Sequence, residues 1–401
     1  MSPFLLLVLA GFLARFGYQM ARSPVLPRFA QDLGAAPALL GLIVAASTVT
    51  GIVIKLPAGA LSDLLGRKRM MLLGCCFFAG PPLLYPLIHS PGALLGVRFL
   101  HGVATAIFSP VASAYVADLS RRERGEKLGW FAAANDLGAT AGPLLGGLLL
   151  FYTASYTATY LAVSVLGILP LLVMLRMPDA DQPAAHAATL GERSRQFWAG
   201  IAEVLSNRPV LVASTMEAAM YVGYGAFLGF FPPYAKGIGL NDAQIALVMG
   251  GHLAATMVAK PFSGRLSDRL GRKPLIVAGL FLCAATLPAV PTLTSIWTLA
   301  LVSGLFGLGV AIVTPSTTAL VADLVETGRM GSAMGVFGTI WDCGEAGGPI
   351  LAGLLISALF YSAAFALIAV FMAAVACFFM VTVSDPSVPV AARGGELRSR
   401  Q

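Results

Sequence analysis

Long apolar segments separated by short polar turns run along almost the whole chain. A helix needs roughly 20 mostly apolar residues to cross a lipid bilayer, so the pattern predicts an all-α membrane protein. Twelve spans are expected, at approximately 4–26, 37–59, 70–89, 92–117, 128–150, 156–176, 208–234, 241–262, 274–292, 295–320, 331–355 and 358–383.

Two polar stretches interrupt or end this pattern. Residues 177–206 are rich in proline and alanine and become amphipathic near Phe197 and Trp198, which predicts a cytoplasmic linker ending in a surface helix. Residues 385–401 are polar and predict a disordered cytoplasmic tail. The expected parts are a six-helix bundle over 1–176, the linker over 177–206, a second six-helix bundle over 207–384 and the tail over 385–401.

The two halves of the chain resemble each other in sequence. An offset of 205 residues aligns GIVIKLPAGALSDLLGRKRMMLLG (51–74) with TMVAKPFSGRLSDRLGRKPLIVAG (256–279), and one further residue of shift aligns Asp136 with Asp342. Several such matches occur in the same order, which indicates an internal duplication. Parallel duplicated halves, with a substrate site between them near the middle of the membrane, are a known plan for secondary transporters.

Composition supports a membrane location. The chain is 57% hydrophobic and 11% charged, with a mean hydropathy of +0.82, whereas soluble domains carry about 25% charged residues. The five cysteines all lie in predicted spans, so neither a disulfide framework nor a metal site is expected.

The net charge of +7 does not indicate a nucleic-acid partner, because of where the basic residues lie. With the N-terminus placed in the cytoplasm, nineteen of the 26 lysines and arginines fall on cytoplasmic segments. The positive-inside rule therefore predicts a multi-pass protein of the cytoplasmic (inner) membrane with both termini in the cytoplasm.

A short motif occurs at equivalent places in the two halves, GALSDLLGRKR at 59–69 and GRLSDRLGRKP at 264–274. Each copy falls in a tight cytoplasmic turn between consecutive spans. Glycine permits such a turn, the aspartate can lie at a helix N-terminus, and the arginine can pair with an acid. The motif predicts a latch that forms in one conformational state and breaks in the other. The alternative is a basic loop that only sets the topology.

On this duplicated motif the chain resembles the major facilitator superfamily, whose characteristic loops follow the second and eighth helices. The resemblance covers essentially the whole chain and implies twelve helices in two pseudo-symmetric six-helix bundles. It also implies that Arg67 faces Asp118 and that Arg272 faces Asp323. Leu64 departs from the family pattern, which often has a basic residue there. The implied gating residues are Gly59, Asp63, Gly66, Arg67, Lys68, Asp118, Gly264, Asp268, Gly271, Arg272, Lys273 and Asp323. Asp63 is expected to approach the start of the eleventh helix near Gly331, and Asp268 the start of the fifth near Leu128.

The fifth predicted helix contains a second motif, GATAGPLLGG (138–147). Small residues four apart allow close helix contact. By the resemblance, this pattern marks the antiporter branches that export drugs, so it is the main indication of the direction of transport. The alternative is ordinary close packing, because a degenerate copy occurs around Gly348. The predicted helix-packing residues are Gly138, Gly142, Pro143, Gly146 and Gly147.

Several charged residues fall inside apolar spans, where a charge costs about 2.5–3.5 kcal/mol or more. Arg98 opens the run RFLHG (98–102) early in the fourth helix, and the resemblance links an arginine at this place to proton coupling, although His101 replaces the glutamine more common in the family. The alternative is that Arg98 snorkels to the outer boundary. In the first helix Arg15 falls near mid-membrane, where it is expected to line the central cavity or to form an ion pair within the N-terminal half. The predicted cavity residues are Arg15, Tyr18, Gln19, Arg22, His101 and Trp341.

Four acids also fall inside spans, and a carboxyl group in a low-dielectric cavity can bind and release a proton when its cationic partner moves. The residues predicted to couple transport to protons are Asp136, Asp342, Glu345, Glu217 and Arg98. Asp342 is the strongest candidate, since Glu345 lies one turn away. Structural ion pairing is the alternative for each acid. Lys55 and Lys260 occupy equivalent places in the second and eighth helices, and both are expected to snorkel toward the cytoplasmic interface.

No phosphate-binding loop, nucleophile motif or zinc spacing occurs, so an enzyme, ATP-driven pumping and a bound cofactor are not expected. The first functional hypothesis is proton-coupled export of a small amphiphilic or hydrophobic molecule. The second is uptake or exchange of an anionic metabolite held by arginines, and the third is a sensor or lipid flippase. The expected partners are a small-molecule substrate and the bilayer, with the protein acting as a monomer and the proton gradient as the energy source.

Overall fold

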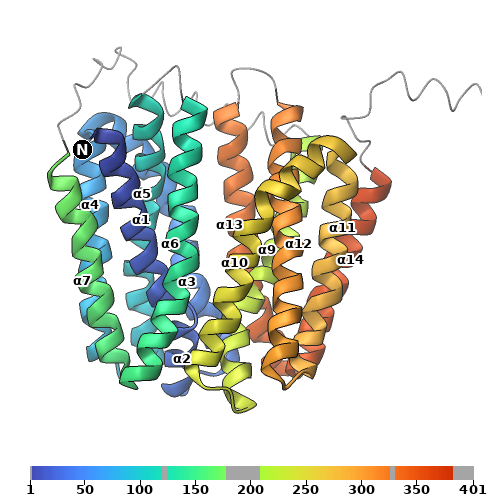
Figure 1. Ribbon diagram of the computed structural model, residues 1–401. Helices are drawn as coiled ribbons and strands as arrows, with labels where there is room; N and C mark the ends of the chain where they lie inside the picture. The colour runs from blue at the N-terminus through green and yellow to red at the C-terminus, as the bar shows by residue number, and fades with distance from the viewer. Residues whose placement is uncertain (1, 120–123, 178–207, 326–329, 383–401) are drawn as a thin grey trace, which may run out of the picture.

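The computed structural model describes residues 2–119, 124–177, 208–325 and 330–382 (Figure 1). The predicted tail, and the predicted linker apart from Met177, lie outside this range. The first half contains α1 (Pro3–Arg22), α2 (Val25–Asp32), α3 (Pro37–Leu65), α4 (Arg67–Ala79), η1 (Pro81–Leu87), α5 (Pro91–Leu119), α6 (Arg124–Thr153) and α7 (Tyr156–Leu175). The second half contains α9 (Arg208–Gly237), α10 (Asp242–Leu270), α11 (Arg272–Thr286), η2 (Leu287–Thr292), α12 (Ile296–Leu324), α13 (Met330–Ala358) and α14 (Tyr361–Thr382).

The described helices form twelve spans when α1 is taken with α2, α4 with η1, and α11 with η2. Ten of the twelve are long and apolar enough to cross a membrane by length and composition. The other two, α6 and α13, have 30 and 29 residues, and they are less apolar because they carry acids and many glycines. The described residues form no strands, as predicted.

The predicted third and ninth helices each divide into an α-helix and a 3₁₀ helix. The division falls at Gly80 in the first half and at Leu287 in the second. Prolines cluster after both points, and proline removes a backbone donor and clashes with the preceding turn of an α-helix. The same break in both halves is a structural trace of the duplication.

The halves meet along two interfaces that are equivalent by the duplication. In one, α3 of the first half packs against α13 of the second, and in the other, α10 of the second half packs against α6 of the first. Figure 1 shows these four helices along the middle of the molecule, with the remaining spans on either side. Each interface thus joins the second helix of one half to the fifth helix of the other.

Both interfaces are tightly packed at the end that holds α2 and the turn between α9 and α10, at the bottom of Figure 1. A methyl group added at Gly41 would overlap the carbonyl group of Pro349, and one added at Gly147 would overlap the side chain of Ala246. We call this end the sealed end. The start of α1 lies at the opposite end (Figure 1).

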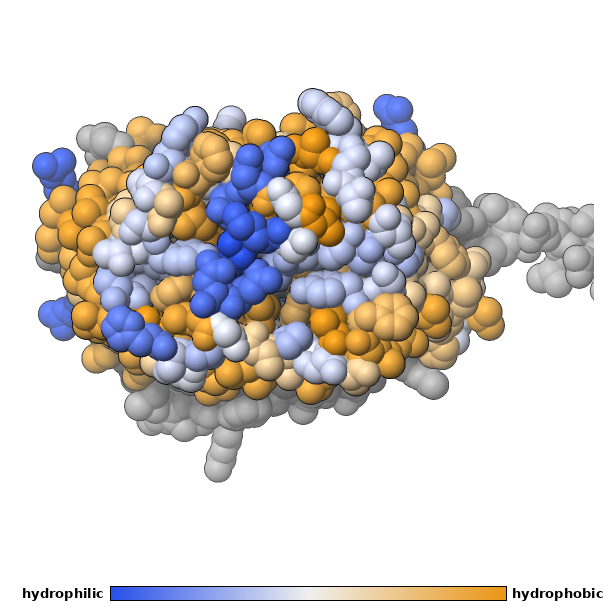
Figure 2. Space-filling model, turned by 90° about the horizontal axis from the view of Figure 1, so that it is seen from below, coloured by the Kyte–Doolittle hydropathy of each residue, from blue (hydrophilic) through white to orange (hydrophobic). Residues whose placement is uncertain are grey.

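The sealed end carries an ion-pair network across the two halves. Arg28 Nε lies 3.2 Å from Asp242 Oδ1, and Lys236 Nζ lies 3.2 Å from Asp242 Oδ2. Arg28 also contacts Asp32, whose Oδ2 accepts a hydrogen bond of 2.5 Å from the Tyr156 hydroxyl. Figure 2 looks onto this end and shows a hydrophilic strip across the middle of a largely apolar face.

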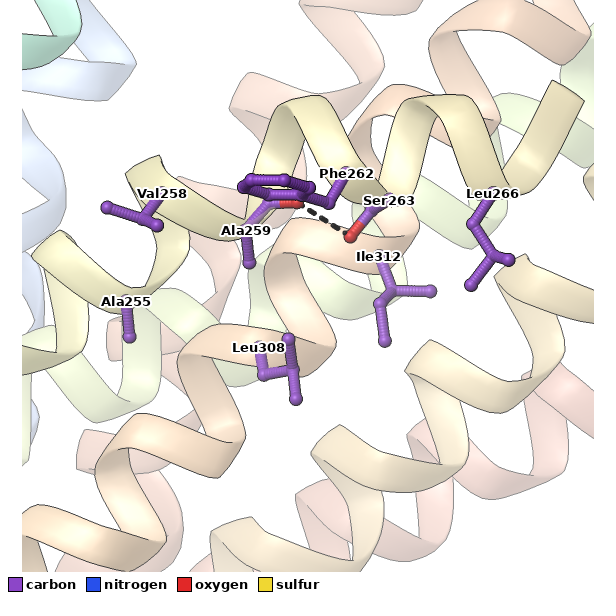
Figure 3. A pocket seen from close by; sticks show the side chains of 8 residues that line it. All are labelled: Ala255, Val258, Ala259, Phe262, Ser263, Leu266, Leu308 and Ile312. Atoms are coloured by element: carbon purple, nitrogen blue, oxygen red, sulfur yellow. Dashed lines mark hydrogen bonds between the residues drawn. The ribbon is translucent and has the colours of Figure 1, made fainter.

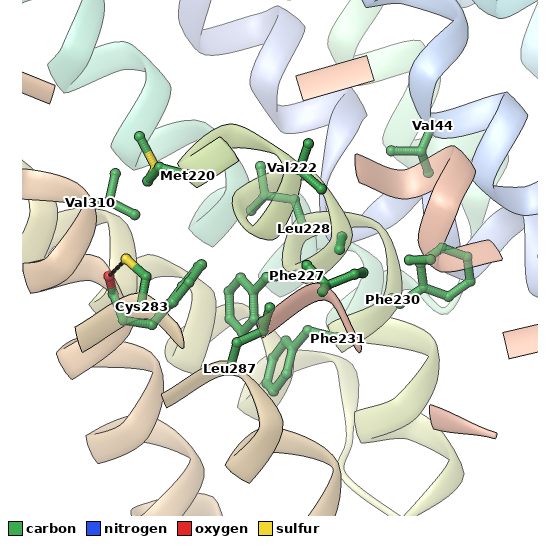
Figure 4. Close-up of a cluster of buried hydrophobic side chains, with 14 of the residues drawn as sticks. Val44, Met220, Val222, Phe227, Leu228, Phe230, Phe231, Cys283, Leu287 and Val310 are labelled. Atoms are coloured by element: carbon green, nitrogen blue, oxygen red, sulfur yellow. Dashed lines mark hydrogen bonds between the residues drawn. The ribbon is translucent and has the colours of Figure 1, made fainter. Parts of the chain in front are cut away.

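The hydrophobic core is continuous between the halves at this end. Phe227, Phe230 and Phe231 of α9 are fully buried, and Val44 of α3 belongs to the same cluster of buried side chains (Figure 4). The outer rim is apolar instead of polar, with Trp297 80% exposed and Val381 88% exposed. Such a rim is stable only against lipid, because a water-facing surface rarely exposes large contiguous apolar patches.

Candidate functional site

Two lysine–aspartate pairs join the halves, one at each interface. Lys55 of α3 pairs with Asp342 of α13, and Lys260 Nζ of α10 lies 3.2 Å from Asp136 Oδ2 of α6. The expectation that both lysines snorkel to the interface is wrong. Their amino groups reach acids of the other half instead, because the interface places a carboxylate within reach of each flexible stem.

A further ion pair across the halves joins the first helix, α1, to α13. Arg22 Nη2 is 2.5 Å from Glu345 Oε1, the two side chains are only 12% and 13% exposed, and Arg22 also donates to Thr48 at 3.4 Å. Asp342 and Glu345 therefore each have their own cation from the first half. Arg15 is half-buried and lies close enough to Glu345 for an electrostatic interaction.

An aromatic cluster lies beside these acids on α9 and α13. Tyr221 stacks on Trp341 with ring centroids 5.3 Å apart, and it makes an edge contact with Tyr224 at 5.5 Å. The Trp341 indole Nε1 donates to Asp342 Oδ1 at 2.9 Å. The predicted cavity residue Trp341 is thus joined to a predicted proton-coupling acid.

Glu217 of α9 is the most deeply buried of the four acids. It has no exposed surface, and one carboxyl oxygen accepts a hydrogen bond from the Thr317 hydroxyl of α12. Thr314 lies beside the same carboxyl group, but neither its hydroxyl nor Glu217 Oε1 has a well-formed hydrogen bond to the described residues. Glu217 forms no ion pair with the described residues, so a charge on this buried carboxyl group would be costly.

Arg98 does not snorkel, but is fully buried inside the first half. Its Nη2 donates to Ser47 Oγ at 2.6 Å, its Nη1 lies 3.4 Å from the Tyr85 hydroxyl, and its guanidinium carbon lies 5.8 Å from the centre of the Tyr18 ring. His101 Nδ1 is 3.2 Å from the Tyr85 hydroxyl. Two predicted cavity residues, Tyr18 and His101, therefore belong to a buried cluster around Arg98.

Gln19 is also buried, and its Oε1 has no hydrogen-bond partner among the described residues. Its predicted role in the substrate cavity, like those of Tyr18 and His101, stays a prediction.

The two arginine–aspartate contacts implied for the loop motifs are present. Arg67 Nε lies 3.3 Å from Asp118 Oδ2, and Arg272 Nε lies 3.1 Å from Asp323 Oδ2. Arg272 also pairs with Asp268. The contacts predicted for the Asp63 side chain and for Gly331 lie outside the described side chains. The gating role of both motifs stays a prediction.

The glycines of the fifth helix pack α6 against α1. A methyl group at Gly138 would lie 2.7 Å from the carbonyl oxygen of Phe12, and one at Gly142 would lie 2.6 Å from that of Phe16. Gly146 faces Met20 in the same way. Close packing accounts for these three glycines. Gly147 faces the other half, and Pro143 lies inside the helix.

Several contributing residues were missed by sequence reasoning. The partners Tyr85 and Ser47 of Arg98, and Thr317 of Glu217, had no charge or motif to mark them. The pairs that Lys55 and Lys260 form with acids had one signal in the sequence. The two lysines align with each other in the repeat, just as their partners Asp342 and Asp136 do.

One surface groove of about 500 Å³ lies elsewhere, between α10 and α12 (Figure 3). Its lining includes Val258 and Phe262 of α10 and Leu308 and Ile312 of α12. Ser263 uses its hydroxyl to donate to the carbonyl oxygen of Ala259 at 3.0 Å. None of the predicted site residues lines this groove.

The twelve-helix duplicated fold and its two loop motifs can be compared with known proteins. A family model described as the Major Facilitator Superfamily matches residues 7–241 and 214–400. The chain belongs to the Major Facilitator Superfamily. Two relatives in the superfamily have names that refer to resistance. The chain is 27% identical over 344 residues to multidrug resistance protein 2 of Bacillus subtilis, covering 83% of each protein. It is 23% identical over 335 residues to a quinolone resistance protein of Staphylococcus aureus, covering 83% of this chain and 84% of that one.

Among solved structures of the superfamily, a nucleoside transporter matches with a TM-score of 0.79 at 13% identity, over 96% of this chain and 100% of that one. At this identity the match shows the fold alone, and it confirms the predicted major facilitator architecture. The chain is therefore a multi-pass membrane transporter and not an enzyme.

Proposed function

We propose that this transporter exports a small amphiphilic or hydrophobic compound in exchange for protons, by alternating access between two halves. The observation that carries the proposal is a set of intramembrane acids at and beside the interfaces between the two halves. Asp342 and Glu345 pair with cations of the opposite half beside an aromatic cluster, while Glu217 is buried inside the second half and forms no ion pair with the described residues. The names of the two resistance proteins support export of this substrate class.

In the proposed cycle, Glu217 holds a proton in the state described here, because a lone buried carboxylate would cost several kcal/mol. Asp342 and Glu345 are held ionised by Lys55 and Arg22. Protons exchange when the halves move and the pair of Arg22 with Glu345 separates. Aromatic rings of Tyr221 and Trp341 offer an apolar, flat surface to the substrate.

We further propose that the sealed end faces outward and that both termini lie on the cytoplasmic side of the membrane. The support is the positive-inside distribution of basic residues. The predicted central cavity is then accessible from the cytoplasm in this state. The transporter acts as a monomer, and it uses the proton gradient without any bound cofactor.

The alternative of anion exchange is not favoured by the geometry. Arg22 is engaged by Glu345, and Arg98 is buried with Ser47 and Tyr85. Two of the three arginines that could hold an anion, Arg22 and Arg98 but not Arg15, are therefore already engaged by other side chains.

Inside-out vesicles with an acidic interior test the proposal, using three fluorescent amphiphilic dyes of positive, neutral and negative charge. We expect uptake of the positive or neutral dye that a protonophore abolishes. Gradient-independent counterflow of the anionic dye would support exchange instead. Uptake in vesicles lacking the protein, equal to that with it, would refute transport of these compounds.

A further inference from the structure

The two lysine–aspartate pairs are related by the duplication and cross in opposite directions. In the first, the lysine comes from the N-terminal half and the acid from the C-terminal half, and in the second the origins are reversed. The aligned positions are Lys55 with Lys260 and Asp136 with Asp342. The molecule therefore repeats the same bond on both sides of the pseudo-twofold axis.

Among the contacts described between α3 and α13 and between α6 and α10, the two pairs lie farthest from the sealed end. Along α6 and α10, Gly147 faces Ala246, Gly250 faces Leu144, and the Thr140 hydroxyl lies 3.8 Å from the Met257 sulfur. The next contact in this series is the pair of Lys260 with Asp136. Lys55 and Asp342 end the corresponding series along α3 and α13, which includes Gly41 against Pro349.

We propose that these two pairs are the fulcrum on which the halves rock, with Lys55 and Lys260 as its positioning residues. The proposal rests on alternating access, which belongs to the proposed function. Two rigid bodies that separate at one end turn about their innermost contact. A line through the two pairs runs between the halves and meets both interfaces, so both interfaces can turn about it together.

The chemistry of the pairs fits a contact that is kept during rotation. Lysine has a flexible four-carbon stem and a compact charge, so its amino group can follow a carboxylate while the helices tilt. Lys55 and Lys260 are 36% and 33% exposed, which leaves their stems room to swing. By contrast, the glycine and proline contacts at the sealed end have no slack and must separate when that end opens.

The position of the fulcrum sets a ratio of movements. Lys260 lies eighteen residues from the start of α10 at Asp242 and ten residues from its end at Leu270. At 1.5 Å per residue the two arms are about 27 Å and about 15 Å long. The paired acids lie nearer the middle of α6 and α13, so opening the sealed end should move its residues about 1.3 to 1.8 times as far as the opposite ends close.

Three pairs of spin labels can measure these movements in lipid nanodiscs. Label pairs at Ala36→Cys with Gly237→Cys, at Leu65→Cys with Leu270→Cys, and at Val53→Cys with the natural Cys343 report on the sealed end, the opposite end and the fulcrum. All of these positions are exposed. In each case the other exposed cysteines are replaced by serine, while the buried Cys75 and Cys283 remain. The state is shifted by pH and by Arg28→Ala.

We expect the first two distances to change in opposite directions with a ratio of about 1.3 to 1.8, while the distance at the fulcrum stays constant. In the variant Lys55→Met/Lys260→Met the fulcrum distance should broaden. Charge exchange in Lys55→Asp/Asp342→Lys should leave it narrow. Lys236→Ala is the matched control, because it removes a lysine–aspartate pair of the same 3.2 Å length within one half, and it should leave the fulcrum distance unchanged.

A fulcrum distance that changes with the state, a clearly different ratio, or a double lysine variant with an unchanged narrow distance would overturn the fulcrum and leave alternating access standing. A charge-exchange variant as broad as the double lysine variant would also overturn it. Immobility of both outer distances under every condition would instead refute rocking itself, and with it the proposed function.

Discussion

Removing the charge of Arg22 should destabilise the protein in a way that depends on pH. The variant Arg22→Met leaves Glu345 buried without its main cation. Breaking a buried pair by removing one partner typically costs about 3–5 kcal/mol. The carboxyl group can limit this cost by taking up a proton. With an ordinary glutamate pKa of about 4.3, protonation at pH 7 costs about 3.7 kcal/mol, and at pH 5 about 1 kcal/mol.

The reverse variant, Glu345→Met, should behave differently. It leaves a buried guanidinium, and arginine stays protonated at any pH a protein tolerates. Its deficit should therefore be the same at pH 5 and pH 7. The double variant Arg22→Met/Glu345→Met removes both charges and should be close to the parent, because well-packed apolar replacements of a buried pair are often neutral or stabilising.

Thermal unfolding of the purified protein in detergent at pH 5, 6 and 7 measures all four members of this cycle, each against the parent at the same pH. The expected pattern is a lowered Tm for Arg22→Met at pH 7 that recovers toward the parent at pH 5. The reasoning is refuted by an Arg22→Met deficit that is equal at both pH values, or by a double variant less stable than either single one.

Three further changes have defined outcomes. Gly142→Ala places a methyl group 2.6 Å from the Phe16 carbonyl oxygen and should lower stability by about 1–3 kcal/mol. The control Gly129→Ala adds its methyl group in open space and should raise Tm slightly. Equal effects of the two substitutions would contradict the packing of α6 on α1. Glu217→Gln keeps the shape of a protonated carboxyl group, so it should fold normally and lose gradient-driven uptake; retained uptake would remove Glu217 from proton coupling. Arg28→Ala loses the bond to Asp242 across the sealed end and should raise the population open at that end about fivefold in distance measurements, while an unchanged population would show that the network does not hold this end closed.

The spans and the duplication were predictable because both depend on local sequence. Hydrophobic length marks the helices, and the offset of 205 residues aligns the two loop motifs. The contacts of Arg67 with Asp118 and of Arg272 with Asp323 could be predicted because they repeat a family pattern within one half. The 3₁₀ segments at η1 and η2 were not predicted, although their prolines are a visible signal.

The partners of intramembrane charges were not predictable in the same way. Helical periodicity states which residues share a face, but not which helix of the other half that face meets. The sequence therefore predicts that Lys55 reaches the cytoplasmic membrane interface, whereas α13 brings Asp342 beside it. Arg98 likewise gave no sign that a serine and tyrosines, and no acid, would surround it.

The four ion pairs that join the halves among the described residues also bear on how the chain is assembled. Of their eight groups, the first half contributes three cations, Arg22, Arg28 and Lys55, and one acid, Asp136; the second half contributes three acids and one cation. Alone in a membrane, the first half would hold a surplus positive charge on its inner face, and the second half a surplus negative one. The charged groups of the N-terminal bundle therefore lack their partners until the C-terminal bundle is inserted. The attraction between opposite charges then favours association of the two different halves over association of two identical ones.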